Sequence, residues 1–428
     1  MPRELPARIL QDPSLGFTRL PRRGAVAPDL VVVFDRYGDD RVQARMYGTA
    51  LPAIGSEHRV LLDRRPTEIQ GVSSRLRRLW KREFVEFQPL EEGYEPPGRI
   101  RPYASLIDLR DEPERELYDS LEELATQGSH LLFELLLAGE PETPVGLFRA
   151  FLMDALAGER PLRIRFDSDL LYVPWAMLAL PAGAVPGPSG LDGLFPRFLG
   201  YRHQIEQTCG YHGVLPGPAP RRPPELPVVS LNHDTGIDRQ GRTRAHDVAD
   251  ALAKGTVLTE RTTRAELLDA LERGRLDEQL MYFWCHGNFR TDDGQSPCLV
   301  VRLSDGREID AYTLRGRRPT PGTADPFQPL VMLNACFAAQ PSGADLAYLG
   351  QALMDRGARG IIGPQIEMPQ IFAAEYALGF VTRYLDGRET AGEIAHALAR
   401  HFADSFRNPL GFAYGLHGGM DERLERAS

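Results

Sequence analysis

The second half of the chain alternates short apolar segments with amphipathic ones, and this pattern constrains the fold more than any other feature. Strands that are apolar throughout are buried on both faces, and helices between consecutive strands favour parallel pairing. We therefore predict an α/β fold with a mostly parallel sheet flanked by helices on both faces. The expected strands are residues 228–231, 256–259, 280–285, 330–334 and 360–362, and the expected helices are residues 244–253, 264–272, 345–356, 370–385 and 391–402. A short hairpin is expected from residues 298–303 and 308–314.

The composition of the chain excludes several classes of protein. The chain has 428 residues, 42% of them hydrophobic, which is enough for two or three domains. The net charge of −9 argues against general nucleic-acid binding. The longest apolar runs, such as residues 131–138, are interrupted by charge and too short to cross a bilayer, and the first residues lack the apolar core of a signal peptide. Four cysteines cannot build a disulfide framework, so a cytoplasmic protein without membrane or nucleic-acid partners is expected.

The first half of the chain reads differently. Residues 30–34 and 42–47 predict a β-hairpin, and residues 74–87 predict an amphipathic helix that runs into a short strand. Further helices are expected in residues 114–138 and 143–157. Residues 161–180 are expected to form a strand, a turn and a second strand that ends at Pro174-Trp175. The basic residues of the 74–87 segment fit a solvated helix face better than an interaction patch. They are Arg75, Arg77, Arg78, Lys81 and Arg82.

Three regions follow from these shifts in pattern. Residues 1–100 are predicted to form a β-rich lobe for docking or sensing. Residues 101–218 are predicted to form a second region made of helices and strands. Residues 219–428 are predicted to form a third, α/β region, which begins within the Pro-rich linker 215–227.

Two of the buried strands end in reactive side chains. The 280–285 strand runs into His286-Gly287, and the 330–334 strand runs into Ala335-Cys336. Either residue alone would more often be structural, but neighbouring parallel strands would bring both to one sheet edge. A free thiol is only about 3% thiolate at pH 7, so a nearby imidazole that takes its proton would activate it. The backbone N–H groups of Gly287 and Cys336 are predicted to form an oxyanion hole.

These segments also carry a resemblance to a known family. The runs Tyr282–Gly287 (YFWCHG) and Leu330–Cys336 (LVMLNAC) resemble the two signature strands of the CHAT peptidases. These are relatives of caspases, metacaspases, gingipain and separase. Residues 162–180, 346–363 and 408–414 are similar to further segments of that family.

The resemblance implies a cysteine endopeptidase with a caspase-like fold, in which residues 219–428 are the catalytic half and residues 101–218 an inactive companion half. Cys336 matches the nucleophile and His286 matches the general base and acid. It further implies cleavage of a specific partner protein without a cofactor, an activating partner, and a role as a regulated protease in a bacterial defence or cell-death pathway. The chain departs from the family after the cysteine, where Phe337-Ala338-Ala339 stands in place of a small, Gly-containing run.

Three acidic residues are rival candidates for binding substrate. Glu367 follows the 360–362 strand, while Asp292 and Asp293 lie in the segment after His286. A carboxylate beside the dyad would favour Arg or Lys before the scissile bond, although each acid also fits an ordinary surface or turn position.

Two other interpretations compete with the peptidase. Cys285, His286, Cys298 and Cys336 lack the spacing of a zinc site, so no metal is expected. A non-enzymatic caspase-fold scaffold is the main alternative, and the presence of both Cys336 and His286 argues against it.

Overall fold

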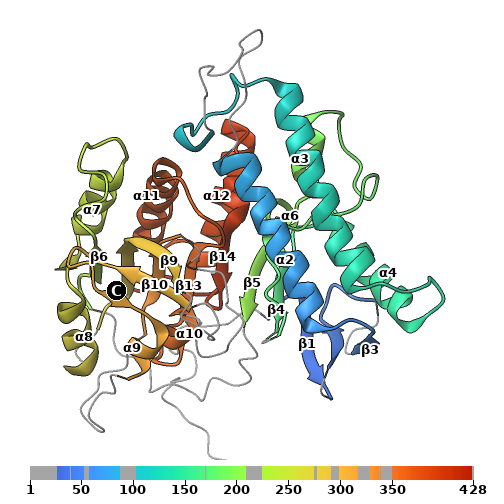
Figure 1. Ribbon diagram of the computed structural model, residues 1–428, viewed down its shortest axis with the longest axis horizontal. Helices are drawn as coiled ribbons and strands as arrows, with labels where there is room; N and C mark the ends of the chain where they lie inside the picture. Colours follow the sequence, from blue (N-terminus) through green and yellow to red (C-terminus); the bar gives the residue numbers. More distant parts are fainter. Residues whose placement is uncertain are drawn as a thin grey trace, which may run out of the picture.

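The computed structural model describes residues 27–38, 40–52, 57–86, 103–168, 170–208, 224–273, 277–290, 298–316, 328–336, 338 and 349–426 (Figure 1). The strands are β1 Leu30–Tyr37, β2 Arg41–Tyr47, β3 His58–Leu62, β4 Arg163–Asp167, β5 Gln204–Thr208, β6 Val228–His233, β7 Val257–Arg261, β8 Leu280–Trp284, β9 His286–Arg290, β10 Cys298–Arg302, β11 Glu308–Ile309, β12 Leu330–Asn334, β13 Gly360–Pro364 and β14 Tyr414–His417. The α-helices are α2 Pro66–Trp80, α3 Glu114–Ser129, α4 Pro144–Ala157, α5 Leu191–Leu194, α6 Leu199–Arg202, α7 Ala245–Ala253, α8 Arg264–Arg273, α9 Ala311–Arg315, α10 Leu349–Met354, α11 Gln370–Asp386 and α12 Ala391–Phe406. Shorter helical turns are η1 Lys81–Val85, η2 Tyr103–Ser105, η3 His130–Leu136, η4 Trp175–Met177, η5 Phe195–Arg197 and η6 Pro409–Ala413.

One sheet of eleven strands runs through the described chain, in the order β3-β2-β1-β4-β5-β14-β13-β12-β8-β6-β7. The pairs β1/β4, β4/β5, β5/β14, β13/β12, β12/β8, β8/β6 and β6/β7 are parallel, and the other three are antiparallel. This confirms the predicted mostly parallel sheet. A small antiparallel sheet, β11-β10-β9, stands apart from it.

The apolar strands of the second half bury both of their faces, as predicted. Alternate residues of β8 enter two different core clusters, with Tyr282 in one and Phe283 in the other. Helices α2, α3, α7, α11 and α12 contribute to the first cluster, while α8, α9 and α10 contribute to the second. Figure 1 shows α7, α11 and α12 following one another along the sheet, with α8 to α10 grouped beside the small sheet. The helices therefore flank the sheet on both faces.

The strand-rich N-terminal region continues this sheet. The expected hairpin forms from β1 and β2, and β1 pairs in parallel with β4. Strand β5 pairs with β14 where Gln207 lies opposite His417, and a ring nitrogen of His417 lies 2.6 Å from the Gln207 amide nitrogen. The division into three regions stays a prediction, because strands from all three lie in one sheet.

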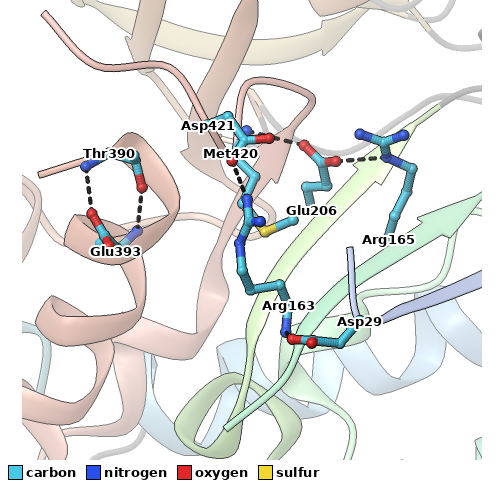
Figure 2. Close-up of polar contacts among 8 residues, drawn as sticks. All are labelled: Asp29, Arg163, Arg165, Glu206, Thr390, Glu393, Met420 and Asp421. Atoms are coloured by element: carbon cyan, nitrogen blue, oxygen red, sulfur yellow. Dashed lines mark hydrogen bonds and ion pairs between the residues drawn. The ribbon is translucent and has the colours of Figure 1, made fainter. Parts of the chain in front are cut away.

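Polar contacts fasten the end of the chain to the first half (Figure 2). The buried carboxylate of Glu206 accepts hydrogen bonds from Met420 N–H at 3.0 Å and from Arg165 Nε at 2.6 Å. Arg163 forms an ion pair with Asp421, and its backbone N–H donates to Asp29. The segment that contains Met420 is therefore held against β4 and β5 by buried and half-buried charges.

Two predicted strands are absent. Residues 81–85 continue α2 as the π-helical turn η1 in place of a strand, and Phe87 lies outside the described residues. Residues 170–174 run irregularly into η4, because side chains of α2 bind their carbonyl groups. Gln70 donates to Leu170 at 2.6 Å and Arg77 donates to Tyr172 at 2.5 Å. The strand that pairs with β4 is instead the polar β5.

Other local predictions are confirmed. The helix expected in residues 143–157 forms as α4, and Thr143 caps it by accepting a hydrogen bond from Gly146 N–H at 3.1 Å. The hairpin of β10 and β11 forms, but its second strand ends at Ile309 because Asp310 caps the short helix α9. Strand β9, which starts at His286, has no clear signal in its sequence HGNFR and was not expected. In the described part of the chain, the helices are all too short or too polar to cross a membrane.

Candidate active site

Four parallel neighbouring strands, β6, β8, β12 and β13, end at one edge of the sheet. Trp284 at the end of β8 lies opposite Asn334 at the end of β12. His286 and Cys336 each follow two residues later, so the register brings both segments to the same edge. The expected adjacency of the two strands is therefore present, at the carboxyl ends where parallel sheets bind ligands.

The two segments contact each other through their backbones. A Cβ atom built on Gly287 would lie 2.3 Å from the carbonyl oxygen of Cys336 and 3.1 Å from its nitrogen. Any side chain at this position would clash with main-chain atoms that cannot move aside cheaply. Gly287 therefore allows the peptide after His286 to pack directly on the peptide of Cys336.

Cys336 is half-buried, and its thiol faces the segment that follows β13. Burial raises the pKa of the thiol above its ordinary value. The backbone N–H groups of Met368 and of Cys336 itself hydrogen-bond to the sulfur and lower this pKa. The negative charge of Glu367 raises it, and the positive charge of Lys81 lowers it. Burial dominates, so the thiol is mainly protonated at neutral pH.

His286 is exposed and begins β9, where it lies opposite Arg302 in the small sheet. Within the described residues, no hydrogen bond joins the His286 ring to the Cys336 thiol. Asp292 and Asp293, the two rival candidates for binding substrate, lie outside the described residues. The roles predicted for His286 and Cys336 remain predictions.

Glu367 is paired with a residue from the other half of the chain. Lys81 Nζ lies 2.8 Å from Glu367 Oε2 and 2.8 Å from Glu86 Oε1. Hydrogen bonds to Glu367 and to Glu86 raise the pKa of Lys81. The segment after β13 is thus connected to η1, which continues α2.

The basic residues of the 74–87 segment are not one solvated face. Arg77 is 4% exposed, donates to the Tyr172 carbonyl at 2.5 Å and lies 3.4 Å from Gln365 Oε1. Its burial lowers the pKa of the guanidinium to about 9. The expectation of a solvated face is wrong for Arg77, because α2 packs on the edge that carries Gln365 and Glu367.

Asn334, two residues before Cys336, anchors the end of β12 through three side-chain hydrogen bonds. Its Oδ1 accepts from the Tyr414 hydroxyl at 2.9 Å, and its Nδ2 donates to the Ala373 carbonyl at 2.9 Å and to the Tyr282 hydroxyl at 3.3 Å. The Tyr414 ring stacks on Tyr376. The last residue of β12 is therefore held by α11, β14 and β8 together.

Cys285 is more deeply buried than Cys336. It belongs to the second core cluster, and burial, together with the nearby Cys336, raises the pKa of its thiol. In the described part of the chain, no three His, Cys, Asp or Glu residues gather where they could hold a metal ion.

Sequence reasoning missed three of the residues around Cys336. Lys81 was grouped with a surface face, and nothing in the sequence connects it to a residue almost three hundred positions away. Met368 contributes a backbone group, which has no sequence signal. Asn334 was visible as the one amide at the end of an apolar strand, and such a buried amide must find hydrogen-bond partners.

Comparisons with known proteins give one family and several distant structures. The CHAT domain matches residues 132–408, more than half of the chain. Two crystal structures of the Saccharomyces cerevisiae separase–securin complex, at 2.6 and 3.0 Å resolution, are similar with TM-scores of 0.45 and 0.42 and 10% identity. Each match covers 91% of this chain and 30% of the separase chain, so this chain spans about a third of that protein.

A third structure, described as a protease, has a TM-score of 0.39 and 11% identity. That match covers 74% of this chain and 72% of the other. None of the curated proteins matches the sequence significantly. With the profile match over residues 132–408 and the His286 and Cys336 segments at one sheet edge, the chain belongs to the CHAT domain family.

Proposed function

We propose that this protein is a cysteine endopeptidase in which Cys336 is the nucleophile and His286 the general base and acid. The observation that carries the proposal is the parallel register of β8 and β12, in which Trp284 lies opposite Asn334. Cys285 and Ala335, the residues just before His286 and Cys336, both belong to the second core cluster. Gly287, just after His286, packs on the backbone of Cys336. Both contacts hold the two segments together, which supports a meeting of imidazole and thiol.

The proposed chemistry uses the groups at this edge in sequence. His286 takes the thiol proton, and the thiolate attacks the carbonyl carbon of the scissile peptide bond. Backbone N–H groups of Gly287 and Cys336 stabilise the oxyanion, and each such donor is typically worth about 3–4 kcal/mol in the transition state. The imidazolium then protonates the leaving amine, and water hydrolyses the resulting thioester.

Glu367 is proposed to bind the side chain that precedes the scissile bond. Its carboxylate acts electrostatically on the Cys336 thiol and already pairs with a cationic side chain, that of Lys81. Both facts support a preference for Arg or Lys at the cleavage site. We further propose that the substrate is a specific partner protein and that cleavage is regulated, in bacterial defence or cell death in the cytoplasm.

The deciding experiment compares cleavage by the purified chain, by two variants of the proposed catalytic residues and by one control variant. Fluorogenic peptides with Arg, Lys, Gln or Asp before the scissile bond, and co-expressed products of neighbouring genes, serve as substrates. Cys336→Ala and His286→Ala should each abolish cleavage without changing the melting temperature, while Cys298→Ala serves as a control. Cleavage that survives in Cys336→Ala would refute the proposal.

A catalytically inactive scaffold is the second candidate, and the raised pKa of Cys336 favours it. Alkylation by iodoacetamide separates the two. An activated thiol reacts well before Cys285 and Cys298, which are buried. Equal labelling of all three, in the presence as well as the absence of a partner protein, would favour the scaffold.

A further inference from the structure

Lys81 forms an ion pair with Glu367, the carboxylate proposed to bind a basic side chain of the substrate. Its ammonium group is 2.8 Å from Glu367 Oε2, and its positive charge lowers the pKa of the Cys336 thiol. Lys81 comes from η1, the last turn of the helical arm that starts with α2, whereas Glu367 follows β13. The pair therefore joins the N-terminal region to the edge that carries the candidate nucleophile.

We propose that Lys81 is an internal competitor for the substrate-binding carboxylate: it occupies Glu367 in the resting protein, and the Arg or Lys side chain of a substrate must displace it. This inference rests on the proposed role of Glu367. It makes Lys81 a determinant of both specificity and latency, because an uncharged side chain before the scissile bond cannot take its place on the carboxylate.

The geometry gives the displaced ammonium group a second partner. Glu86 Oε1 also lies 2.8 Å from Lys81 Nζ. Lysine carries a compact charge on a flexible stem and can keep one carboxylate while it leaves another. Lys81 is 25% exposed and Glu367 40% exposed, so their ion pair is accessible to solvent and weak enough to exchange.

A second contact holds α2 against the segment that carries Glu367. Arg77, one helical turn before Lys81, lies against Gln365 Oε1 while its guanidinium also binds the Tyr172 carbonyl. Gln365 and Glu367 are two residues apart, and Arg77 is buried. A shift of α2 that moved Arg77 would therefore also withdraw Lys81 from Glu367, so a protein bound to the N-terminal region could expose the carboxylate.

The test uses benzamidine, a small aromatic cation, as a probe for a free Glu367. Benzamidine on Glu367 should shield the neighbouring thiol, so the alkylation rate of Cys336 by iodoacetamide is measured in the full chain at rising benzamidine concentrations. Peptide mass spectrometry locates the label, and each variant is normalised to its own rate without benzamidine.

Four variants give distinct expectations. Lys81→Met should lower the concentration for half-protection by roughly two- to fivefold, the range of an exposed ion pair. Glu86→Gln should raise that concentration, because Lys81 loses its second partner. Glu367→Gln should abolish protection. Arg82→Met is the matched control and should behave like the wild type, since Arg82 is exposed and pairs with Glu83.

Equal protection in wild type and Lys81→Met, with protection lost in Glu367→Gln, would overturn the proposal. Absence of protection in every variant would overturn it as well, because Glu367 would then not bind cations. These outcomes do not depend on proteolysis. If the variants show the expected order of protection but the chain cleaves no peptide, the proposed competition by Lys81 stands and the proposed peptidase activity is refuted.

Discussion

Gly287 packs directly on Cys336: a Cβ on the glycine would lie 2.3 Å from the cysteine's carbonyl oxygen. This contact joins the segment after β8 to the segment after β12, and the atoms of Cys336 that take part are its main-chain oxygen and nitrogen. The spacing between the two candidate catalytic residues is thus set by a glycine, next to the histidine, that leaves no room for a side chain.

Gly287→Ala should therefore separate the two segments. A displacement of about 1 Å at a catalytic centre can cost on the order of a hundredfold in rate, so peptide cleavage should fall by that amount while the fold persists. Cleavage kinetics and the melting temperature measure the two effects. Gly241→Ala is a control for general glycine effects because an added Cβ there meets open space, although its positive φ costs some stability. Unchanged cleavage by Gly287→Ala would contradict this role.

Asn334→Leu tests the support beneath Cys336. The substitution removes the acceptor of the buried Tyr414 hydroxyl, and a buried unsatisfied group costs about 1–3 kcal/mol. It also removes the bond to the Ala373 carbonyl, which keeps its partner within α11, so this second loss is smaller. We expect the free energy of unfolding in urea to fall by roughly 2–4 kcal/mol. Tyr414→Phe removes one of these bonds and should cost less. Equal losses in the two variants would show that the Ala373 contact contributes little.

The sheet could be predicted from the sequence because its central strands are apolar on both faces. Segments such as LMYFW and LVMLN leave few alternatives to burial between two layers of helices, and their ends position His286 and Cys336. The polar strand β5, QIEQT, could not be found in the same way. Its Glu206 is buried only because Arg165 and Met420 N–H bind its carboxylate, and that arrangement depends on distant segments.

The surroundings of Cys336 were hidden for the same reason. Helical periodicity placed Arg77 and Lys81 on a helix, but it could not show that α2 packs against Gln365 and Glu367. Backbone donors such as Met368 N–H leave no trace in residue identity. The reactive residues were therefore predictable, whereas their electrostatic environment required the tertiary structure.

Glu206→Leu should loosen the end of the chain (Figure 2). It removes the acceptor for Met420 N–H and for Arg165, and hydrogen bonds to a charged group are worth roughly 1.5–3 kcal/mol each. The melting temperature should drop, and hydrogen exchange at Met420 should accelerate. Glu206→Gln keeps an oxygen for Met420 N–H and should exchange more slowly there than Glu206→Leu. Identical exchange in both variants would show that this bond does not protect the segment.

The pH dependence of Cys336 alkylation tests the electrostatics of the site. Burial raises the thiol pKa, so the rate should keep rising above pH 8.5, roughly the pKa of a free cysteine. Glu367 raises this pKa further and Lys81 lowers it. Glu367→Gln should therefore shift the alkylation profile to lower pH, and Lys81→Met should shift it to higher pH, because the first removes a negative charge and the second a positive one. Arg82→Met should leave the profile unchanged. Shifts in the same direction for Glu367→Gln and Lys81→Met would mean that neither charge acts directly on the sulfur.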